Sequence, residues 1–160
     1  MVQRAAEDLR KKLRPASSNL TSAAGLAANS DSELMYRQGK YFSNQYNNRH
    51  QPADFDHAFA DLKRALELDP KLADAAAEIA MLFAFKAEGG ESAEEAIRQI
   101  EPWARRAIDI DPRCALGWAA LTASEVYQIR PDNRKAMGYA LKAAFLGPQS
   151  AFCQQGLSLV

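Results

Sequence analysis

Apolar residues recur along most of this chain at intervals of three and four, the spacing that places them on one face of an α-helix. From residue 32 onward the pattern predicts helices at about 32–46, 55–68, 72–87, 93–110, 114–129 and 133–146, with a further one beginning near 150. Alanine is abundant, whereas glycine, proline and β-branched residues are few. This composition favours helices over strands, so we predict an all-α chain.

Three of the predicted helices end in the same way. The sequence ALELDP at 65–70 returns as AIDIDP at 107–112 and, more loosely, as AAFLGP at 143–148. A fixed internal period of this kind is the signature of a repeat protein in which each helix pair is covered by its neighbour. Apolar residues fall 12, 8 and 5 positions before each proline: Ala58, Leu62 and Ala65; Ile100, Ala104 and Ala107; and Ala136, Ala140 and Ala143.

Small residues where two helices cross, large ones beside them and a proline closing each pair resemble the tetratricopeptide repeat (TPR) pattern. The resemblance implies a right-handed superhelical array of antiparallel helix pairs, with about three repeats and a partial fourth. The pairs would span about 32–70, 73–112 and 115–148, and the partial repeat 151–160. The prolines lie 42 and 36 residues apart, against the family's repeat of about 34, so residues are inserted between the helices of these pairs.

Two residues depart from the pattern within the repeats. Glu125 stands where an aromatic residue or leucine is usual. Pro102 lies inside a predicted helix, where it removes a backbone donor, so we expect a kink or a break near Gln99–Glu101.

The segment before residue 32 has a different character. Residues 16–31 are small and polar and predict a linker, with room for a weak helical turn around Leu20–Leu26. Before Pro15, an apolar stripe predicts an amphipathic helix over residues 2–13, formed by Val2, Ala5, Ala6, Leu9 and Leu13. We therefore divide the chain into a helix and linker, 1–31, and a repeat domain, 32–160. With ELMYRQGKYFSNQY and ADLKRALELDP, this arrangement resembles the TPR tails of bacterial multidomain transcriptional regulators, adenylate cyclases and kinases.

Charge and cysteine content narrow the functional classes. Twenty basic and twenty acidic residues cancel, which gives no support to direct nucleic-acid binding or to an anionic membrane surface. No run approaches the roughly 18 apolar residues of a membrane span, and the N-terminus lacks the apolar region of a signal peptide. Cys114 and Cys153 have no CxxC spacing, so we expect reduced thiols in a cytoplasmic protein.

In TPR arrays the first helix of each pair lines a concave groove, and the resemblance places this groove in the present chain. Lys40 and Asn44 retain part of the set that grips a peptide carboxylate in some family members, while the next two pairs supply mostly apolar residues. We expect a groove that is slightly basic at one end and suited to an amphipathic helix or an apolar segment. The expected partner-binding residues are Tyr36, Lys40, Asn44, Ala77, Met81, Phe85, Ala123 and Tyr127. A slip of one position, about 100° around the helix, would make Met81, Phe85 and Tyr127 core residues instead.

These features predict a non-catalytic protein–protein interaction module of a bacterial signalling or regulatory protein, with a protein or peptide ligand and no cofactor or metal. One alternative is self-association as a homodimer through residues 2–13, although that stripe could equally fold back onto the array or link to an upstream domain. An enzyme built on a helical scaffold would depend on His57, which Asp54 and Asp61 flank. Such pairs are common on exposed helices, and no nucleophile–base or metal-ligand pattern accompanies them.

Overall fold

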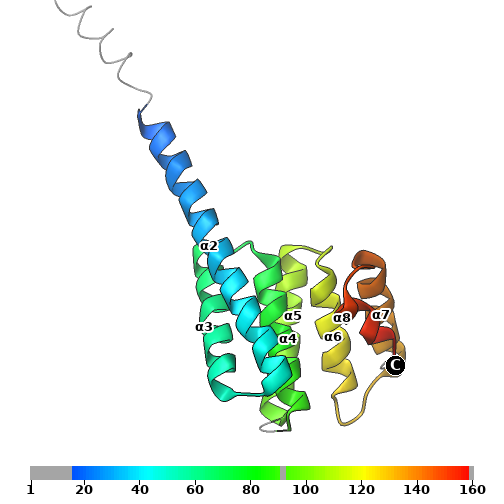
Figure 1. Ribbon diagram of the computed structural model, residues 1–160. Helices are drawn as coiled ribbons and strands as arrows, with labels where there is room; N and C mark the ends of the chain where they lie inside the picture. The colour runs from blue at the N-terminus through cyan, green and yellow to red at the C-terminus, as the bar shows by residue number, and fades with distance from the viewer. Residues whose placement is uncertain (1–15, 91–92, 159–160) are drawn as a thin grey trace, which may run out of the picture.

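The computed structural model describes residues 16–90 and 93–158, and in these residues it contains helices and no strand (Figure 1). The predicted helix at 2–13 lies outside the described residues. The elements in chain order are α2 (Ala16–Arg49), α3 (Pro52–Leu68), α4 (Ala73–Glu88), α5 (Ala93–Ile110), α6 (Ala115–Val126), α7 (Asn133–Leu146), α8 (Ala151–Gln155) and the short 3₁₀ helix η1 (Gly156–Ser158).

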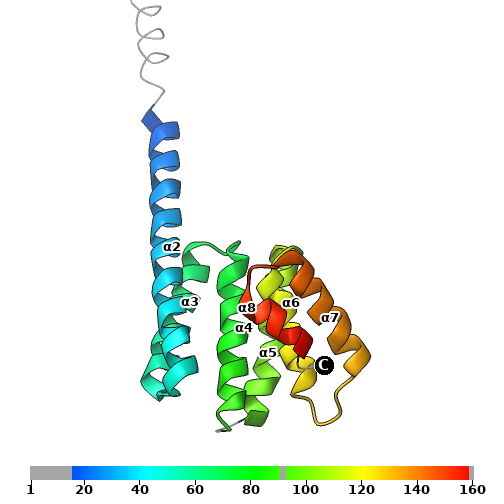
Figure 2. The same cartoon turned by 45° about the vertical axis from the view of Figure 1, so that its right-hand side comes forward.

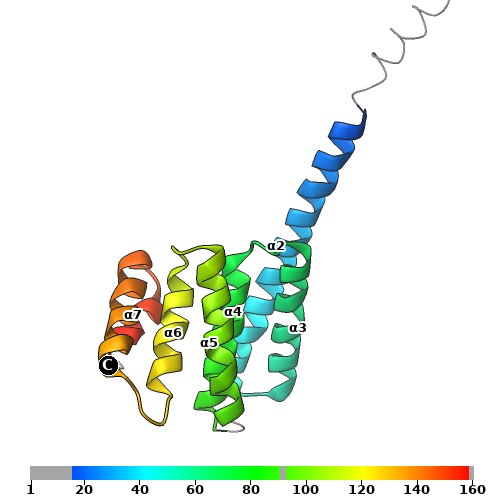
Figure 3. The same cartoon turned by 180° about the vertical axis from the view of Figure 1, so that it is seen from behind.

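The helices pack as successive pairs, α2 with α3, α4 with α5 and α6 with α7. Viewed from the side, α2, α4 and α6 form one layer (Figure 2), and α3, α5 and α7 form the other, which faces the viewer when the molecule is seen from behind (Figure 3). The short helix α8 packs on α6 and α7, in the place of a partial fourth repeat. The fold is therefore an all-α, TPR-like array of helix pairs.

The residues aligned on the three prolines form the centre of each pair. All nine are fully buried, as the repeat pattern predicts. Most of them are alanines, because a small side chain lets two helices approach closely where they cross. Gly39 of α2 has no side chain at all at such a crossing, and a Cβ atom there would lie 2.6 Å from Leu62 Cγ of α3.

The turns after α3 and α5 share one geometry. The Asp69 carboxylate accepts a hydrogen bond from the Lys71 backbone N–H at 3.0 Å, and Asp111 does the same for Arg113 at 2.9 Å. Each aspartate therefore closes a local turn around its proline, at the end of a helix pair.

The sequence prediction was wrong about where α2 begins and ends. The backbone is helical from Ala16, through the residues that predict a linker, and it stays helical to Arg49, so the polar stretch after residue 46 is not an interruption. His50 then turns the chain with a left-handed backbone φ of 52°, and Pro52 occupies the first turn of α3. The alanine content of 16–31 explains the helix, because alanine is the strongest helix former.

The predicted break at Pro102 is also absent, because α5 continues from Ala93 to Ile110 with the proline inside it. The sequence analysis also placed the extra residues of the second repeat between its helices, and this was wrong. Helices α4 and α5 contain 16 and 18 residues, whereas α6 and α7 contain 12 and 14. The extra residues therefore add about one turn to each helix, which keeps their buried faces in register.

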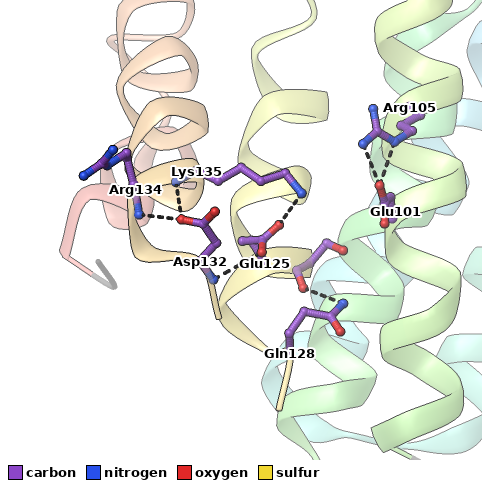
Figure 4. A network of polar contacts seen from close by, with 8 residues as sticks. Glu101, Arg105, Glu125, Gln128, Asp132, Arg134 and Lys135 are labelled. Carbon is purple, nitrogen blue, oxygen red and sulfur yellow. Dashed lines mark hydrogen bonds and ion pairs between the residues drawn. The ribbon is translucent and has the colours of Figure 1, made fainter. Parts of the chain in front are cut away.

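The unusual Glu125 connects α6 to α7. Its carboxylate lies 2.9 Å from Lys135 Nζ and also accepts a hydrogen bond from the Asp132 backbone N–H, as Figure 4 shows. Asp132 in turn caps α7 by accepting hydrogen bonds from the backbone N–H groups of Arg134 and Lys135. A charged residue is tolerated at this position because it holds the turn between the two helices.

Candidate functional site

The layer formed by α2, α4, α6 and α8 presents the surface on which the sequence places the groove, and we call it the inner face (Figure 2). It is built from the first helix of each pair. Residues three or four positions apart along α4, and likewise along α6, lie on this face. Two regions of this face differ in chemistry. One surrounds Tyr36, between α2 and the start of α4, and the other is a pocket between α4, α6 and α8.

The region around Tyr36 is acidic. Burial, followed by the nearby carboxylates of Glu78, Asp74 and Glu33, raises the pKa of the Tyr36 hydroxyl. Lys40 lies 5.7 Å from the centre of the Tyr36 ring and supplies a positive charge to this group. The sequence analysis predicted a slightly basic end and took no account of Glu78, whose carboxyl group is close enough to Tyr36 to raise the pKa of its hydroxyl.

Glu78 itself is almost completely buried between α2 and α4. The Ser43 hydroxyl donates a hydrogen bond to its carboxylate at 2.8 Å. Burial raises the pKa of Glu78, while the Ser43 hydrogen bond and Lys40 act in the opposite direction. Cys114 also faces this region, with its Sγ 3.7 Å from Asp74 Oδ1, and burial raises the pKa of its thiol to about 12. The thiol is therefore protonated at neutral pH and is a poor nucleophile.

The second region is a pocket of about 100 Å³ at the far end of α4, which we call the inner-face pocket. Its apolar wall comes from α4, α6 and α8, with the Phe85 and Phe152 ring centres 5.5 Å apart. Asn47, Glu88 and Gln155 supply polar groups at its edge. The complete lining is Asn47, Met81, Ala84, Phe85, Glu88, Ala119, Thr122, Ala123, Phe152, Gln155 and Gly156.

The eight predicted partner-binding residues divide between these environments. Met81, Phe85 and Ala123 line the inner-face pocket although only 7%, 4% and 8% of their surfaces are exposed. Tyr36 and Lys40 belong to the acidic region, and Asn44 is exposed on the same helix. Ala77 is fully buried among core residues. Tyr127 is partly buried beside the pocket residue Glu88, to whose carboxylate its hydroxyl donates a hydrogen bond.

Met81 and Phe85 therefore belong to both categories that the sequence left open. They are members of the hydrophobic core and they also form part of a pocket wall. Periodicity along a helix cannot distinguish a core residue from a residue of a pocket wall, because the wall of a small pocket is itself closely packed.

Several residues of the site were missed by the sequence analysis. Phe152 comes from α8, which the sequence analysis identified only as the start of a further repeat. The signal that was available is that Phe152 is an aromatic residue in the first turn of that helix. Asn47 follows Asn44 by three residues on the inward side of α2 and was read as part of a loop. Glu78 carries no signal of burial in the sequence, since a glutamate between two alanine-rich stretches is typical of an exposed helix position.

Of the two acids that flank His57 in the sequence, Asp61 interacts with it: burial raises the pKa of Asp61, and the nearby His57 acts in the opposite direction. His57 is exposed on α3 with its ring centre 5.0 Å from that of Phe42, and the ring centres of His50 and Tyr46 lie 5.5 Å apart. Across residues 16–90 and 93–158, no three His, Cys, Asp or Glu side chains are placed to hold a metal ion together. No helix in these residues has the length and apolar character needed to cross a membrane.

Comparisons with known proteins support the fold. No protein-family model matches the sequence, and no curated protein matches it. Solved structures do resemble it, and one of them is the TPR domain of OM64 from Arabidopsis, with a TM-score of 0.60 and 17% sequence identity. The match covers 82% of this chain and 94% of the OM64 domain. At this level of identity the likeness shows a common TPR-like fold.

Proposed function

We propose that this chain is a non-catalytic protein–protein interaction module that binds a peptide or a helix across its inner face. The observation that carries the proposal is the inner-face pocket, because a small pocket that combines an apolar wall with several polar groups is a typical anchoring point for one side chain of a partner. Its volume of about 100 Å³ exceeds the space of a single water and suits a small aliphatic side chain.

The charge of the inner face extends this proposal to the chemistry of the partner. Asp74 and Glu88 lie along α4 without an ion pair to a cation in the described residues, whereas Glu33 of α2 is paired with Arg37 at 2.9 Å, and Lys40 approaches Tyr36. A cationic segment with one apolar anchor is complementary to this surface. A free carboxyl terminus, which Lys40 and Asn44 would favour, meets like charge from Asp74 and Glu88.

The test uses a displayed library of random peptides selected against the wild-type protein. Binding of the selected peptides is then measured for Ala123→Leu, which adds a side chain to the pocket wall while keeping a good helix former in α6. We expect at least a tenfold loss of affinity. Ala60→Leu, at an exposed position of α3, is the matched control and should bind as the wild type does.

Two results would contradict the proposal. Selection of no peptide with a cationic residue near an apolar one would remove the inferred partner chemistry. Equal affinity of the wild type and Ala123→Leu, with unchanged helical content by circular dichroism, would show that the pocket is not the binding site.

The cellular setting is proposed on the sequence resemblance to bacterial regulator tails. In that setting the chain would be a cytoplasmic part of a larger signalling or transcriptional regulator and would recruit or sense a protein partner.

A further inference from the structure

Glu88 is a carboxylate without a cationic partner at the edge of the inner-face pocket. It is the last residue of α4, where the partial negative charge of the helix end makes a further negative charge unfavourable. In the described residues no Lys, Arg or His side chain forms an ion pair with it. Lys86, two positions earlier on the same helix, instead lies over the Phe55 ring, with its Nζ 4.4 Å from the ring centre. The pocket therefore carries a negative charge that no cation of the array compensates.

Tyr127 holds this carboxylate in place. It directly follows α6, and its hydroxyl donates a hydrogen bond to the Glu88 carboxylate on α4. Burial, followed by this hydrogen bond, raises the pKa of the Tyr127 hydroxyl, so it remains a neutral donor at physiological pH. A carboxylate has two oxygens and accepts several hydrogen bonds, so Glu88 keeps acceptor capacity for a ligand. Tyr127 is therefore a positioning residue for the charge at the pocket edge.

Two amide side chains line the same pocket as Glu88. Asn47 comes from α2 and Gln155 from α8, and neither side chain has a hydrogen-bond partner among the residues that the structure describes. Each amide presents a carbonyl oxygen that accepts hydrogen bonds. The aromatic part of the lining is formed by Phe85 and Phe152. One small pocket thus combines a carboxylate and two further acceptors with an apolar wall.

The size of the pocket limits the ligand that can use both parts of it. A volume of about 100 Å³ requires the cation and the apolar group of a ligand to lie close together. A lysine or arginine side chain carries its charge at the end of a long stem. An α-ammonium group, in contrast, is separated from the Cβ atom of its own residue by the Cα atom alone. It also has three N–H donors, which match the acceptors of Glu88, Asn47 and Gln155.

We propose that the inner-face pocket binds the free amino terminus of a partner polypeptide whose first residue has a small aliphatic side chain. Glu88 binds the α-ammonium group, with Asn47 and Gln155 as further acceptors, and the first side chain lies against Phe85 and Phe152. This inference rests on the proposed function, and it assigns the charge beside the apolar anchor to the terminal amine of the partner. Capture of a chain terminus is a known mode of peptide recognition.

The first experiment compares free and acetylated amino termini. Bead-bound synthetic peptides with free amino termini and randomised first positions are screened against the wild-type protein. The affinity of the selected peptides is then measured before and after acetylation, which removes the terminal charge. We expect an aliphatic first residue and a loss of affinity of at least about tenfold on acetylation. Equal affinity of the free and acetylated peptides would overturn the inference.

The pH dependence of binding distinguishes a terminal amine from a lysine side chain. A free α-amino group has a pKa of about 8, whereas that of a lysine side chain is about 10.4. Only the charged amine is attracted to Glu88, so the affinity of the selected peptides should fall as pH rises from about 7 to about 9.5. An affinity that stays constant over this range would show that the terminal amine is not the bound cation, and it would overturn the inference.

Substitutions in the pocket test the roles of its residues. Glu88→Gln keeps an oxygen for the Tyr127 hydroxyl and removes the charge. It should weaken the free-amine peptides by at least about tenfold and leave the acetylated peptides unaffected. Tyr127→Phe should weaken the free-amine peptides by a smaller factor and also leave the acetylated ones unaffected, because the carboxylate is present but no longer held. Glu67→Gln, at an exposed position of α3, is the matched control and should bind as the wild type does.

Ala123→Leu separates this inference from the proposed function. If Ala123→Leu abolishes binding while Glu88→Gln and acetylation change nothing, the pocket anchors a side chain but does not bind an amine, and the inference alone is overturned. If none of these three changes alters the affinity of the selected peptides, the pocket is not the binding site and both are overturned. Selection of no binding peptide would also overturn both.

Discussion

Glu78 is a carboxyl group enclosed between two helices, with 5% of its surface exposed. Three groups around it influence its charge: the Ser43 hydroxyl, Lys40 and Asp74. Burial dominates and raises its pKa above the ordinary value of 4.5. A buried charged carboxylate costs free energy even when it accepts a hydrogen bond, so this residue makes the stability of the array depend on pH.

The substitution Glu78→Gln tests this dependence, because glutamine keeps an oxygen for the Ser43 hydroxyl and cannot ionise. Between 4.5 and the raised pKa, folded Glu78 binds more protons than unfolded Glu78, so the free energy of unfolding of the wild type falls as pH rises. We expect Glu78→Gln to gain stability relative to the wild type across this window, by at most about 1.4 kcal/mol per pH unit. Urea denaturation at a series of pH values measures the difference, and a difference independent of pH would show that Glu78 titrates normally.

Gly39 tests the close crossing of α2 and α3. In Gly39→Ala the new Cβ would lie 2.6 Å from Leu62 Cγ and 3.0 Å from the Leu62 backbone nitrogen, so the helices must separate. We expect a loss of about 1–3 kcal/mol in the free energy of unfolding.

The matched control is Gly138→Ala in α7, where nothing lies within 4 Å of the added Cβ. Alanine should stabilise that helix by about 0.5–1 kcal/mol, because glycine loses more backbone freedom on folding. Equal effects of the two substitutions in chemical denaturation would mean that the α2–α3 crossing is less tight than the structure shows.

At the scale of elements, α5 shows how packing can override a local signal. Pro102 lacks the backbone N–H of an interior helical residue and disfavours the turn before it, yet the helix continues because Ile100, Ala104 and Ala107 on either side are fully buried. Tertiary packing therefore compensates for the local cost.

Replacing Pro102 should remove the unfavourable free energy of a proline inside a helix. Pro102 is exposed, so Pro102→Ala removes no core contact, and it restores a backbone donor in the middle of α5. We expect the melting temperature to rise, with a gain in the free energy of unfolding of up to about 3 kcal/mol. Thermal and urea denaturation measure it, and a destabilised variant would show that the proline shapes the contact of α5 with α4 or α6.

At the scale of the whole molecule, α4 is the central element, since it packs against α2, α3, α5 and α6. It also runs between the two regions of the inner face, with Asp74 near its start and Phe85 and Glu88 near its end.

The sequence by itself determined the array. The three proline endings and the apolar residues before them specified helix pairs and their buried centres, because the spacing of core positions along a helix is a local property. It did not determine how far α2 and α5 extend. Proline, serine and asparagine weaken a helix locally, but this local effect does not decide whether the helix continues. The pattern also supplied part of the site, in Met81, Phe85 and Ala123.

Only the tertiary structure decided the character of the inner face. Glu78 and Phe152 lie far from Tyr36 and Phe85 in the sequence, and stacking of successive pairs brings them together. Periodicity tells which residues share a helix face, but it cannot tell what the neighbouring helix places against that face. Whether an apolar residue closes the core or lines a pocket depends on that neighbour, because both roles require the same side chain and the same burial.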